Sequence, residues 1–261
     1  MLVSGRAAQL VFLIVICFFA VLFINRAKKG RVPWVRRVPG LDAIETAIKR
    51  ATEMGRPVHF SVGFGHYGLT NPTVAPQMLA GLSVLSYIAR IAANTKTELI
   101  VSLAHPEMIP LHEDILRQAY AAEGVPDKFT PDSVRFLSSY QFAYAAGVMG
   151  LLLKEKVASS IMIGSFWAEA LLFAETGAAA GIVQIAGTAM VSQLPFFVAT
   201  CDYVLIGEDI YTAGAYVSKE PVLLGSIQGQ DVGKMFAIAV IIISIVLATF
   251  KIDLLDRLLK M

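Results

Sequence analysis

Two long apolar runs lie near opposite ends of the chain, at Leu10–Ile24 and Met235–Phe250, and neither contains a charged residue. Each run is close to the minimum length that crosses a hydrocarbon core of roughly 30 Å at about 1.5 Å per residue. Basic residues beside each run can extend its reach by placing their charges among the lipid headgroups. We therefore predict two transmembrane anchors, at residues 7–25 and 233–250, on either side of one folded domain.

The first anchor is predicted to be retained. Arg6 ahead of an apolar stretch also fits the outline of a cleaved signal peptide. No small-residue cleavage pattern follows Ile24, however, and the next residues are densely basic. The pattern favours an uncleaved anchor followed by a basic juxtamembrane linker at residues 26–40.

The charges around this anchor predict the orientation of the chain. Six basic residues follow the anchor before the first acidic residue, Asp42, whereas only Arg6 precedes it. The positive-inside rule then places the central domain in the cytoplasm, at the plasma membrane, where anionic lipid would attract the linker. The net charge of +2 is close to neutral, which argues against nucleic acid as a partner.

Between the anchors, helical and strand-like periodicities alternate, which is typical of an α/β domain. The predicted helices are at residues 41–51, 71–93, 111–123, 141–153 and 167–176, and the predicted strands are at 57–62, 99–104, 134–137, 160–164 and 203–206. The strands are continuously apolar rather than alternating, so helices should cover both faces of the sheet. We predict a parallel, Rossmann-like sheet in a cytoplasmic α/β domain at residues 41–230.

One half of this domain is almost free of charge. Between Phe136 and Cys201 the charged residues are Lys154, Glu155, Lys156, Glu169 and Glu175. The predicted helix at 141–153 lacks the polar outer stripe of a solvent-facing helix. We therefore expect this surface to pack against a second subunit, a partner protein or lipid, and we favour a homo-oligomer or a larger membrane complex.

The charge-free stretch at residues 176–200 has two interpretations. A third membrane span is one interpretation, because it would place the basic excess of the predicted amphipathic tail, residues 251–261, in the cytoplasm. Gln184, Gln193 and Pro195 make the stretch a poor inserter. The pattern therefore favours two spans.

The two cysteines limit the chemistry that the chain can carry. Cys17 lies in the first anchor and Cys201 stands alone in the domain, so neither an intradomain disulfide nor a cysteine-based zinc site can form. We interpret Cys201 as a small buried apolar residue.

Three segments carry a resemblance to a known family: Ser61–Gly68 (SVGFGHYG), Ala104–Glu107 (AHPE) and Ala199–Asp209 (ATCDYVLIGED). They resemble prokaryotic membrane proteins known only as a domain of unknown function. The likeness covers most of the region from residue 40 to residue 235. It implies a single membrane-anchored domain, and it implies no activity, cofactor or catalytic residue.

A glycine motif follows the first predicted strand. Gly63, Gly65 and Gly68 match the pattern GxGxxG, which in dinucleotide-binding folds lets a strand turn into a helix whose N-terminus receives a pyrophosphate. Prolines delay the helix here, and no acidic residue ends a strand about twenty residues further on. The motif is open to two readings, a phosphate-binding loop and a tight loop that needs positive φ.

Topology indicates where a ligand would bind, which is outside the carboxyl ends of the parallel strands. Besides the three glycines, the candidates at that edge are His66, His105, Glu107, Ser165, Glu169, Glu208 and Asp209. Two histidines with carboxylates can bind a divalent metal, but their spacing matches no known ligand pattern. We assign no metal ligand and no catalytic residue, and the pattern specifies no cofactor.

Two residues have a structural interpretation beside the functional one. Glu169, at the start of an apolar helix, could act as a base or ligand, or it could complement the helix N-terminus and pair with Arg90 or Arg135. We favour the structural role for Glu169. We interpret His59, within a strand, as a hydrogen-bonded core residue.

Three functions remain open. The first is a membrane-anchored structural subunit that oligomerises through its uncharged half. The second is a membrane-tethered module that binds a nucleotide or another small ligand through the glycine loop. The third is a metal-assisted hydrolase at the membrane surface. The first accounts for both the anchors and the bare apolar surface, so the sequence favours it.

Overall fold

The computed structural model describes residues 7–31, 38–66 and 68–250. The chain divides into an α/β unit at residues 37–218 and a helical unit formed by the segments before and after it. The helical unit contains α1 (Ala7–Lys28) and α9 (Pro221–Thr249). The helices of the α/β unit are α2 (Pro39–Met54), α3 (Ala75–Thr95), α4 (Ile109–Ala122), α5 (Gln141–Lys154), α6 (Glu169–Ala179), α7 (Leu194–Thr200) and α8 (Asp209–Ser218). Its strands are β1 (Val58–Ser61), β2 (Leu99–Leu103), β3 (Val134–Phe136), β4 (Ser159–Gly164), β5 (Val183–Thr188) and β6 (Tyr203–Ile206), and its short 3₁₀ turns are η1 (Gly68–Thr70), η2 (Pro106–Met108), η3 (Pro126–Lys128) and η4 (Pro131–Ser133).

The strands of the described residues form one parallel sheet in the order β3-β2-β1-β4-β5-β6. Val58 of β1 is level with Leu99 of β2 on one side and with Ser159 of β4 on the other. The chain therefore starts in the middle of the sheet and builds outward in both directions. This is the doubly wound, Rossmann-like arrangement, and it confirms the predicted fold class.

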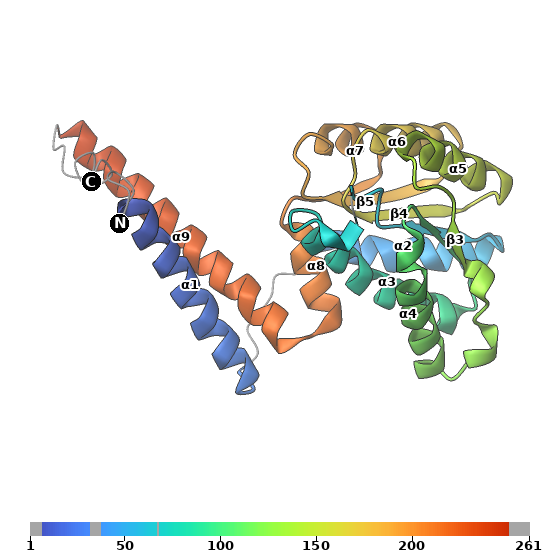
Figure 1. Ribbon diagram of the computed structural model, residues 1–261, viewed down its shortest axis with the longest axis horizontal. Coiled ribbons are helices and arrows are strands. Elements are labelled where there is room, and N and C mark those ends of the chain that lie inside the picture. The colour runs from blue at the N-terminus through green and yellow to red at the C-terminus, as the bar shows by residue number, and fades with distance from the viewer. Residues whose placement is uncertain (1–6, 32–37, 67, 251–261) are drawn as a thin grey trace. The chain divides into compact units, whose positions relative to one another are not determined.

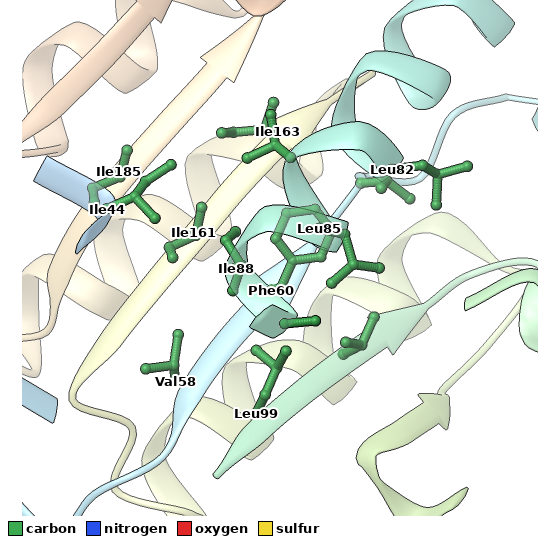
Figure 2. Packing of buried hydrophobic residues seen from close by; sticks show 14 of the residues in the cluster. Ile44, Val58, Phe60, Leu82, Leu85, Ile88, Leu99, Ile161, Ile163 and Ile185 are labelled. Atoms are coloured by element: carbon green, nitrogen blue, oxygen red, sulfur yellow. The ribbon is translucent and has the colours of Figure 1, made fainter. Parts of the chain in front are cut away.

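A hydrophobic core lies on each face of the sheet (Figure 1). On one face α2, α3, α4 and α8 cover the strands, and Leu85 and Ile88 of α3 pack near Phe60 of β1 (Figure 2). On the other face α5, α6 and α7 do so, with Phe173 and Phe197 fully buried. Both faces of the sheet are thus covered by helices and shielded from water, which explains why the strands contain continuous apolar runs.

Local signals set the ends of the first two helices of this unit. α2 ends at Gly55, which takes the left-handed conformation with φ of 62°, as its sequence pattern predicts. α3 begins at Ala75, four residues later than predicted. Asn71 Oδ1 instead accepts a hydrogen bond of 3.0 Å from the backbone N–H of Thr73, which forms a separate turn ahead of the helix.

The interpretation of residues 176–200 as a third membrane span is wrong. Residues 183–188 form β5, which pairs with β4 and β6 in the interior of the sheet. The buried Gln184 side chain, which made the segment a poor candidate for membrane insertion, donates hydrogen bonds to the carbonyl oxygens of Ala174 (2.8 Å) and Thr200 (3.3 Å). β5, α7 and α8 were not predicted.

The helical unit is an antiparallel hairpin. Along it, Ile24 is level with Gly225, and Phe12 is level with Phe236, whose ring centroid is 5.6 Å away. A Cβ at Gly225 would lie 2.6 Å from the backbone of Ile24, and one at Gly229 would lie 2.7 Å from the backbone of Ala20. The glycines therefore let the two helices approach to backbone contact, as in glycine-containing membrane helix pairs.

Both hairpin helices are long and apolar enough to span a membrane. α3 also meets the length and composition criteria, but more than half of its apolar window is buried inside the α/β unit. α9 begins at Pro221, so residues 221–230, which the sequence pattern assigned to the α/β domain, belong to the second hairpin helix. Residues 32–37 of the basic linker and the expected tail at 251–261 lie outside the described residues.

Candidate functional site

The glycine loop after β1 uses its backbone donors internally. Gly63 N donates to Ser61 Oγ (3.0 Å), Phe64 N donates to Glu169 Oε1 (3.1 Å) and Gly65 N donates to the carbonyl oxygen of Ser165 (3.1 Å). A phosphate-binding loop offers these N–H groups to the ligand. Three consecutive N–H groups of this loop are therefore already satisfied by the protein.

The glycines of this loop are needed for contact between two parts of the chain itself. Gly63 has φ of 84°, and a Cβ there would lie 2.1 Å from the carbonyl oxygen of Ser165, which follows β4. Gly65 has φ of 49°, and a Cβ there would lie 2.6 Å from Met78 Sδ. Ser165 N also donates to the carbonyl oxygen of Val62 (3.0 Å). The segments after β1 and β4 are therefore joined at the point where the strand order reverses.

Glu169 is the centre of this junction. Its side chain is fully buried, and it accepts hydrogen bonds from Phe64 N (3.1 Å), Trp167 N (3.0 Å) and Gln141 Nε2 (2.6 Å). The predicted pairing with Arg90 or Arg135 is wrong, because those arginines contact Glu123 and Glu155 respectively. Glu169 thus ties together the glycine loop, the start of α6 and the start of α5.

A chain of buried polar groups lies beneath the loop, on the face that α5 covers. His59 lies between Ser160 Oγ and Ser102 Oγ, with both distances 2.9 Å. Tyr144 OH on α5 lies 3.0 Å from Ser102 Oγ and 2.8 Å from Ser61 Oγ, which accepts the Gly63 N–H. The interpretation of His59 as a satisfied core histidine is confirmed. Burial lowers the pKa of His59 to about 3 and raises the pKa of Tyr144 to about 12, so both are neutral near pH 7.

These pKa values predict that the fold loses stability in mild acid. Burial also lowers the pKa of His112 to about 4, and its Nδ1 donates to the carbonyl oxygen of Met108. Both folded-state pKa values lie below the unfolded value near 6.5, so the stabilisation is complete above about pH 6.5 and is lost as the pH falls towards 4. Between pH 6.5 and 5, where most carboxylates remain ionised, we expect the free energy of unfolding to fall by about 2 kcal/mol per histidine.

Chemical denaturation at a series of pH values measures this loss. His112→Gln should roughly halve the slope over that range, whatever its effect at pH 7, because one of the two protons taken up on unfolding disappears. A free energy of unfolding that stays constant from pH 6.5 to 5 would contradict the assignment.

A separate pocket lies over the ends of the first three strands. It has a volume of about 310 Å³ and is lined by Phe64, His66, Thr70, His105, Glu107 and Ser139. His105 Nε2 donates to the carbonyl oxygens of Phe64 (2.6 Å) and Gly65 (3.0 Å), and its Nδ1 is 3.5 Å from Glu107 Oε1. The pocket thus combines two imidazoles, a carboxylate, two hydroxyls and an aromatic face.

The structure separates the predicted site residues into three groups. His66, His105 and Glu107 meet at the pocket, whereas Ser165 and Glu169 are buried at the junction with Gly63 and Gly65. Gly68 lies beside His105, because a Cβ at Gly68 would be 3.6 Å from the imidazole ring of His105. Glu208 and Asp209 follow β6, an edge strand four positions from β2, and they do not line the pocket. Among the described residues, no group of three histidine, cysteine or carboxylate side chains is placed to hold a metal ion.

Sequence reasoning missed several polar residues of this region. Ser61, Ser102, Tyr144 and Gln141 connect the loop to the sheet and to α5. One signal was present, because Ser102 interrupts a strand that is otherwise apolar. Ser165 Oγ, one of the predicted candidates, is buried with no hydrogen-bond partner in the described part of the chain. Burial raises the pKa of Cys201 to about 11, which holds it as an unreactive thiol.

Comparison with known proteins places the whole chain in one family. The model of the family described as Domain of unknown function (DUF6754) matches residues 1–259. No curated protein and no solved structure matches the chain.

Proposed function

For this chain, which belongs to the family Domain of unknown function (DUF6754), we propose the role of a membrane-anchored structural subunit that assembles with a second copy through α5, α6 and α7. The hairpin of α1 and α9 is the anchor, at the plasma membrane with the α/β unit on the cytoplasmic side. The single observation that carries the proposal is the bare apolar outer surface of those three helices.

The outer surface of α5 is apolar along its length. Phe142 and Leu153 have 65% and 56% of their surface exposed, and Ala143, Ala146 and Gly150 between them are exposed as well. A helix in contact with water normally places polar side chains at these positions. The outward residues of α5 therefore have the composition of a buried face.

α7 continues this surface. Its outward residues include Pro195, Phe196, Val198 and Ala199, and Val198 has 57% of its surface exposed. On α6 the exposed residues include alanines at its C-terminal end, with Glu175 as their charged neighbour. The layer thus offers mostly apolar side chains for assembly to bury, with few charges among them.

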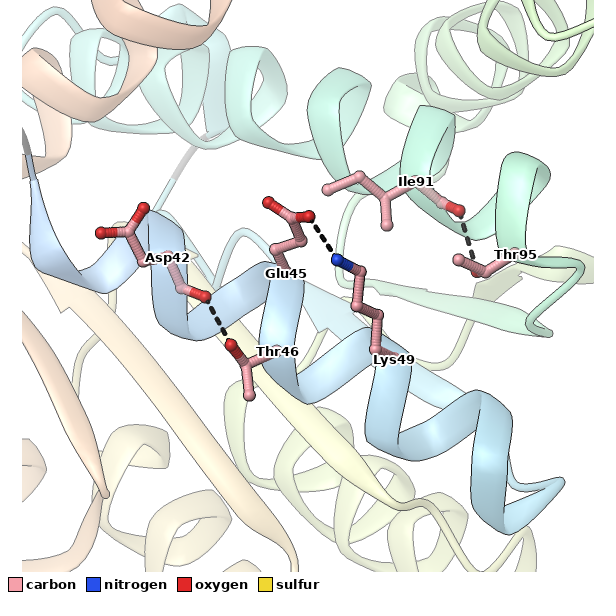
Figure 3. A network of polar contacts seen from close by, with 6 residues as sticks. All are labelled: Asp42, Glu45, Thr46, Lys49, Ile91 and Thr95. Atoms are coloured by element: carbon pink, nitrogen blue, oxygen red, sulfur yellow. Dashed lines mark hydrogen bonds and ion pairs between the residues drawn. The ribbon is translucent and has the colours of Figure 1, made fainter.

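Two helices on the opposite face of the sheet, α2 and α4, follow the usual pattern. On α2, Lys49 Nζ lies 2.7 Å from Glu45 Oε1, and Thr46 Oγ1 donates to the carbonyl oxygen of Asp42 (Figure 3). On α4, Glu113 and Arg117 form another ion pair along the helix. The outer surface of α5 therefore lacks the charged residues that α2 and α4 carry.

A second copy fits this layer better than a charged partner does. On α5 the small residues Ala143, Ala146 and Gly150 form a shallow strip beside Phe142 and Leu153. A twofold axis brings such a strip against its own copy, so that large residues of one helix fill the low strip of the other. With few charges on either side, self-association buries few ionised groups.

We expect Ala146→Glu to dissociate the assembly, because each interface would bury two unpaired carboxylates. The measurement is the mass of the full chain in mild detergent by light scattering. The matched control is Ala121→Glu, the same change at an exposed position of α4 in the charged layer, which should leave the mass unchanged. A parent protein that is monomeric at micromolar concentration would overturn the proposal, and lipid would then be the better occupant of the layer.

A ligand-binding function is the second candidate, and the pocket of His66 and His105 favours it. Its ligand would be a small polar molecule rather than a nucleotide, because the backbone N–H groups of Gly63, Phe64 and Gly65 are already used. We expect no saturable thermal stabilisation by ATP or NAD at millimolar concentration. A ligand at 100 times its Kd would add about 2.7 kcal/mol, so a rise of several degrees in the unfolding temperature would contradict this expectation.

A further inference from the structure

α9 carries an ion pair among its polar residues. Asp231 Oδ1 and Lys234 Nζ are 3.1 Å apart, and 51% and 43% of the two side chains is exposed. Gln230 beside them is exposed too, whereas Gly229 and Gly233 are buried against α1. The pair therefore lies on the side of α9 that faces away from α1.

The register of the hairpin gives the depth of this pair. Ala20 of α1 is level with Gly229, and Ile16 is level with Gly233. Asp231 and Lys234 thus lie beside the middle of the charge-free run of α1, residues 10–24, and not beyond its end. The charge-free run of α9 begins at Met235 and continues about ten residues past that of α1.

A bilayer that surrounds the hairpin takes in this ion pair. The two offset runs together cover about 39 Å at 1.5 Å per residue, whereas the hydrocarbon core is roughly 30 Å thick. Any such core placed over this stretch includes the levels of Asp231 and Lys234. If the core is placed so that the pair lies at its edge, residues 18–24 of α1 lie in water. Phe18 and Val21 in that segment have more than half of their surface exposed on the hairpin, so water would contact their apolar side chains. A hydrocarbon core that covers these two side chains places Asp231 and Lys234 nearer to its middle.

We propose that the face of α9 around Gln230, Asp231 and Lys234 is a membrane-embedded contact between two copies of this chain, in which Asp231 of each copy pairs with Lys234 of the other. This contact adds a second interface to the assembly proposed above, and it rests on that proposal because the partner is again a second copy of the chain. Ionised residues at membrane depth almost always face other protein or water. A twofold axis along the membrane normal brings equal depths together, so Asp231 of one copy lies one helical turn from Lys234 of the other, and the long lysine side chain can reach across to it in both directions.

Charge reversal with trans complementation tests this contact. The full chain carries Cys17→Ser and Cys201→Ser, with Gln230→Cys as a reporter, and disulfide formation between copies is measured in native membranes after copper phenanthroline oxidation. Copies with Asp231→Lys present two bases and copies with Lys234→Asp present two acids. Each variant alone should cross-link about tenfold less than the parent because like charges meet. Co-expressed with tags of different size, they should form the mixed disulfide at the parental level.

The mixed pair distinguishes a contact between copies from the ion pair within one helix. Neither variant can restore that internal pair, and recovery of cross-linking also shows that both variants insert and fold. Parental cross-linking by either variant alone, or mixed cross-linking no higher than that of the single variants, would overturn the proposal. The α5 interface is tested apart from this contact in a chain that also carries Asp231→Lys, where a loss of mass on Ala146→Glu reports the α5 interface alone, so either contact can fail without the other.

Discussion

Glu169→Ala is expected to cost the α/β unit about 3–6 kcal/mol of its free energy of unfolding, because three hydrogen-bond donors lose their common acceptor. Phe64 N and Trp167 N belong to two different loops, and Gln141 Nε2 belongs to α5. Phe64 N is buried and cannot turn to water without opening the junction between β1 and β4. Domains of this size are stable by about 5–15 kcal/mol, so the variant should be marginal.

The matched control is Glu175→Ala, the same change at an exposed position of the same helix, which should shift the free energy by less than about 0.5 kcal/mol. Glu169→Gln should fall between the two, because an amide keeps one acceptor oxygen for Phe64 N and Trp167 N but turns a donor towards Gln141 Nε2. Chemical denaturation of the full chain in detergent measures all three. Equal stabilities for the Glu169→Ala and Glu175→Ala variants would show that the junction does not depend on the carboxylate.

Gly229→Ala is expected to separate the hairpin helices. The added Cβ would lie 2.7 Å from Ala20 Cα, and backbone at such a distance cannot move aside as a flexible side chain can. We expect a loss of about 1–3 kcal/mol from overpacking. Disulfide formation between cysteines placed at Phe12 and Phe236, in a chain without Cys17 and Cys201, reports how close the helices remain.

Gly233→Ala is the control within the same motif. A Cβ at Gly233 would lie 3.7 Å from Ile16 Cγ1, which is ordinary van der Waals contact, so the cross-linking yield should stay at the parental level. If Gly229→Ala cross-links as well as Gly233→Ala does, close backbone packing does not hold the helices together.

Continuous apolar runs made much of the sheet predictable. β1, β2 and β4 are buried along their whole length, and apolar runs such as Leu99–Val101 and Ile161–Ile163 carry the signal despite the polar residues beside them. In β5 the apolar run is shorter because Gln184 and Gly187 interrupt it, and the N–H groups of the Gln184 amide find their acceptors only on α6 and α7, distant in sequence. A strand that contains a buried amide is therefore difficult to predict before the hydrogen-bond partners of that amide are known.

The candidate site was predictable in position but not in its contacts. Parallel topology alone places His66 and His105 at one edge of the sheet, and they share a pocket there. The acceptor role of Glu169 towards Phe64 N depends on a junction between residues more than a hundred positions apart. The spacing Gly225, Gly229, Gly233 was visible in the sequence, yet its meaning depends on which face of α9 meets α1.

The offset between the two apolar runs also has a consequence for the kind of membrane that the protein prefers. An upright hairpin with about 39 Å of apolar length exceeds a 30 Å core, so tilting the hairpin brings more of that length inside. A thicker bilayer requires less tilt. Because Gly225 and Gly229 fix the two helices against each other, they lean as one rod. The positions of these glycines set the offset between the two helices and therefore the apolar length of the hairpin. That length determines which membrane thickness the hairpin matches, and so how the protein would sort between thin and thick membranes.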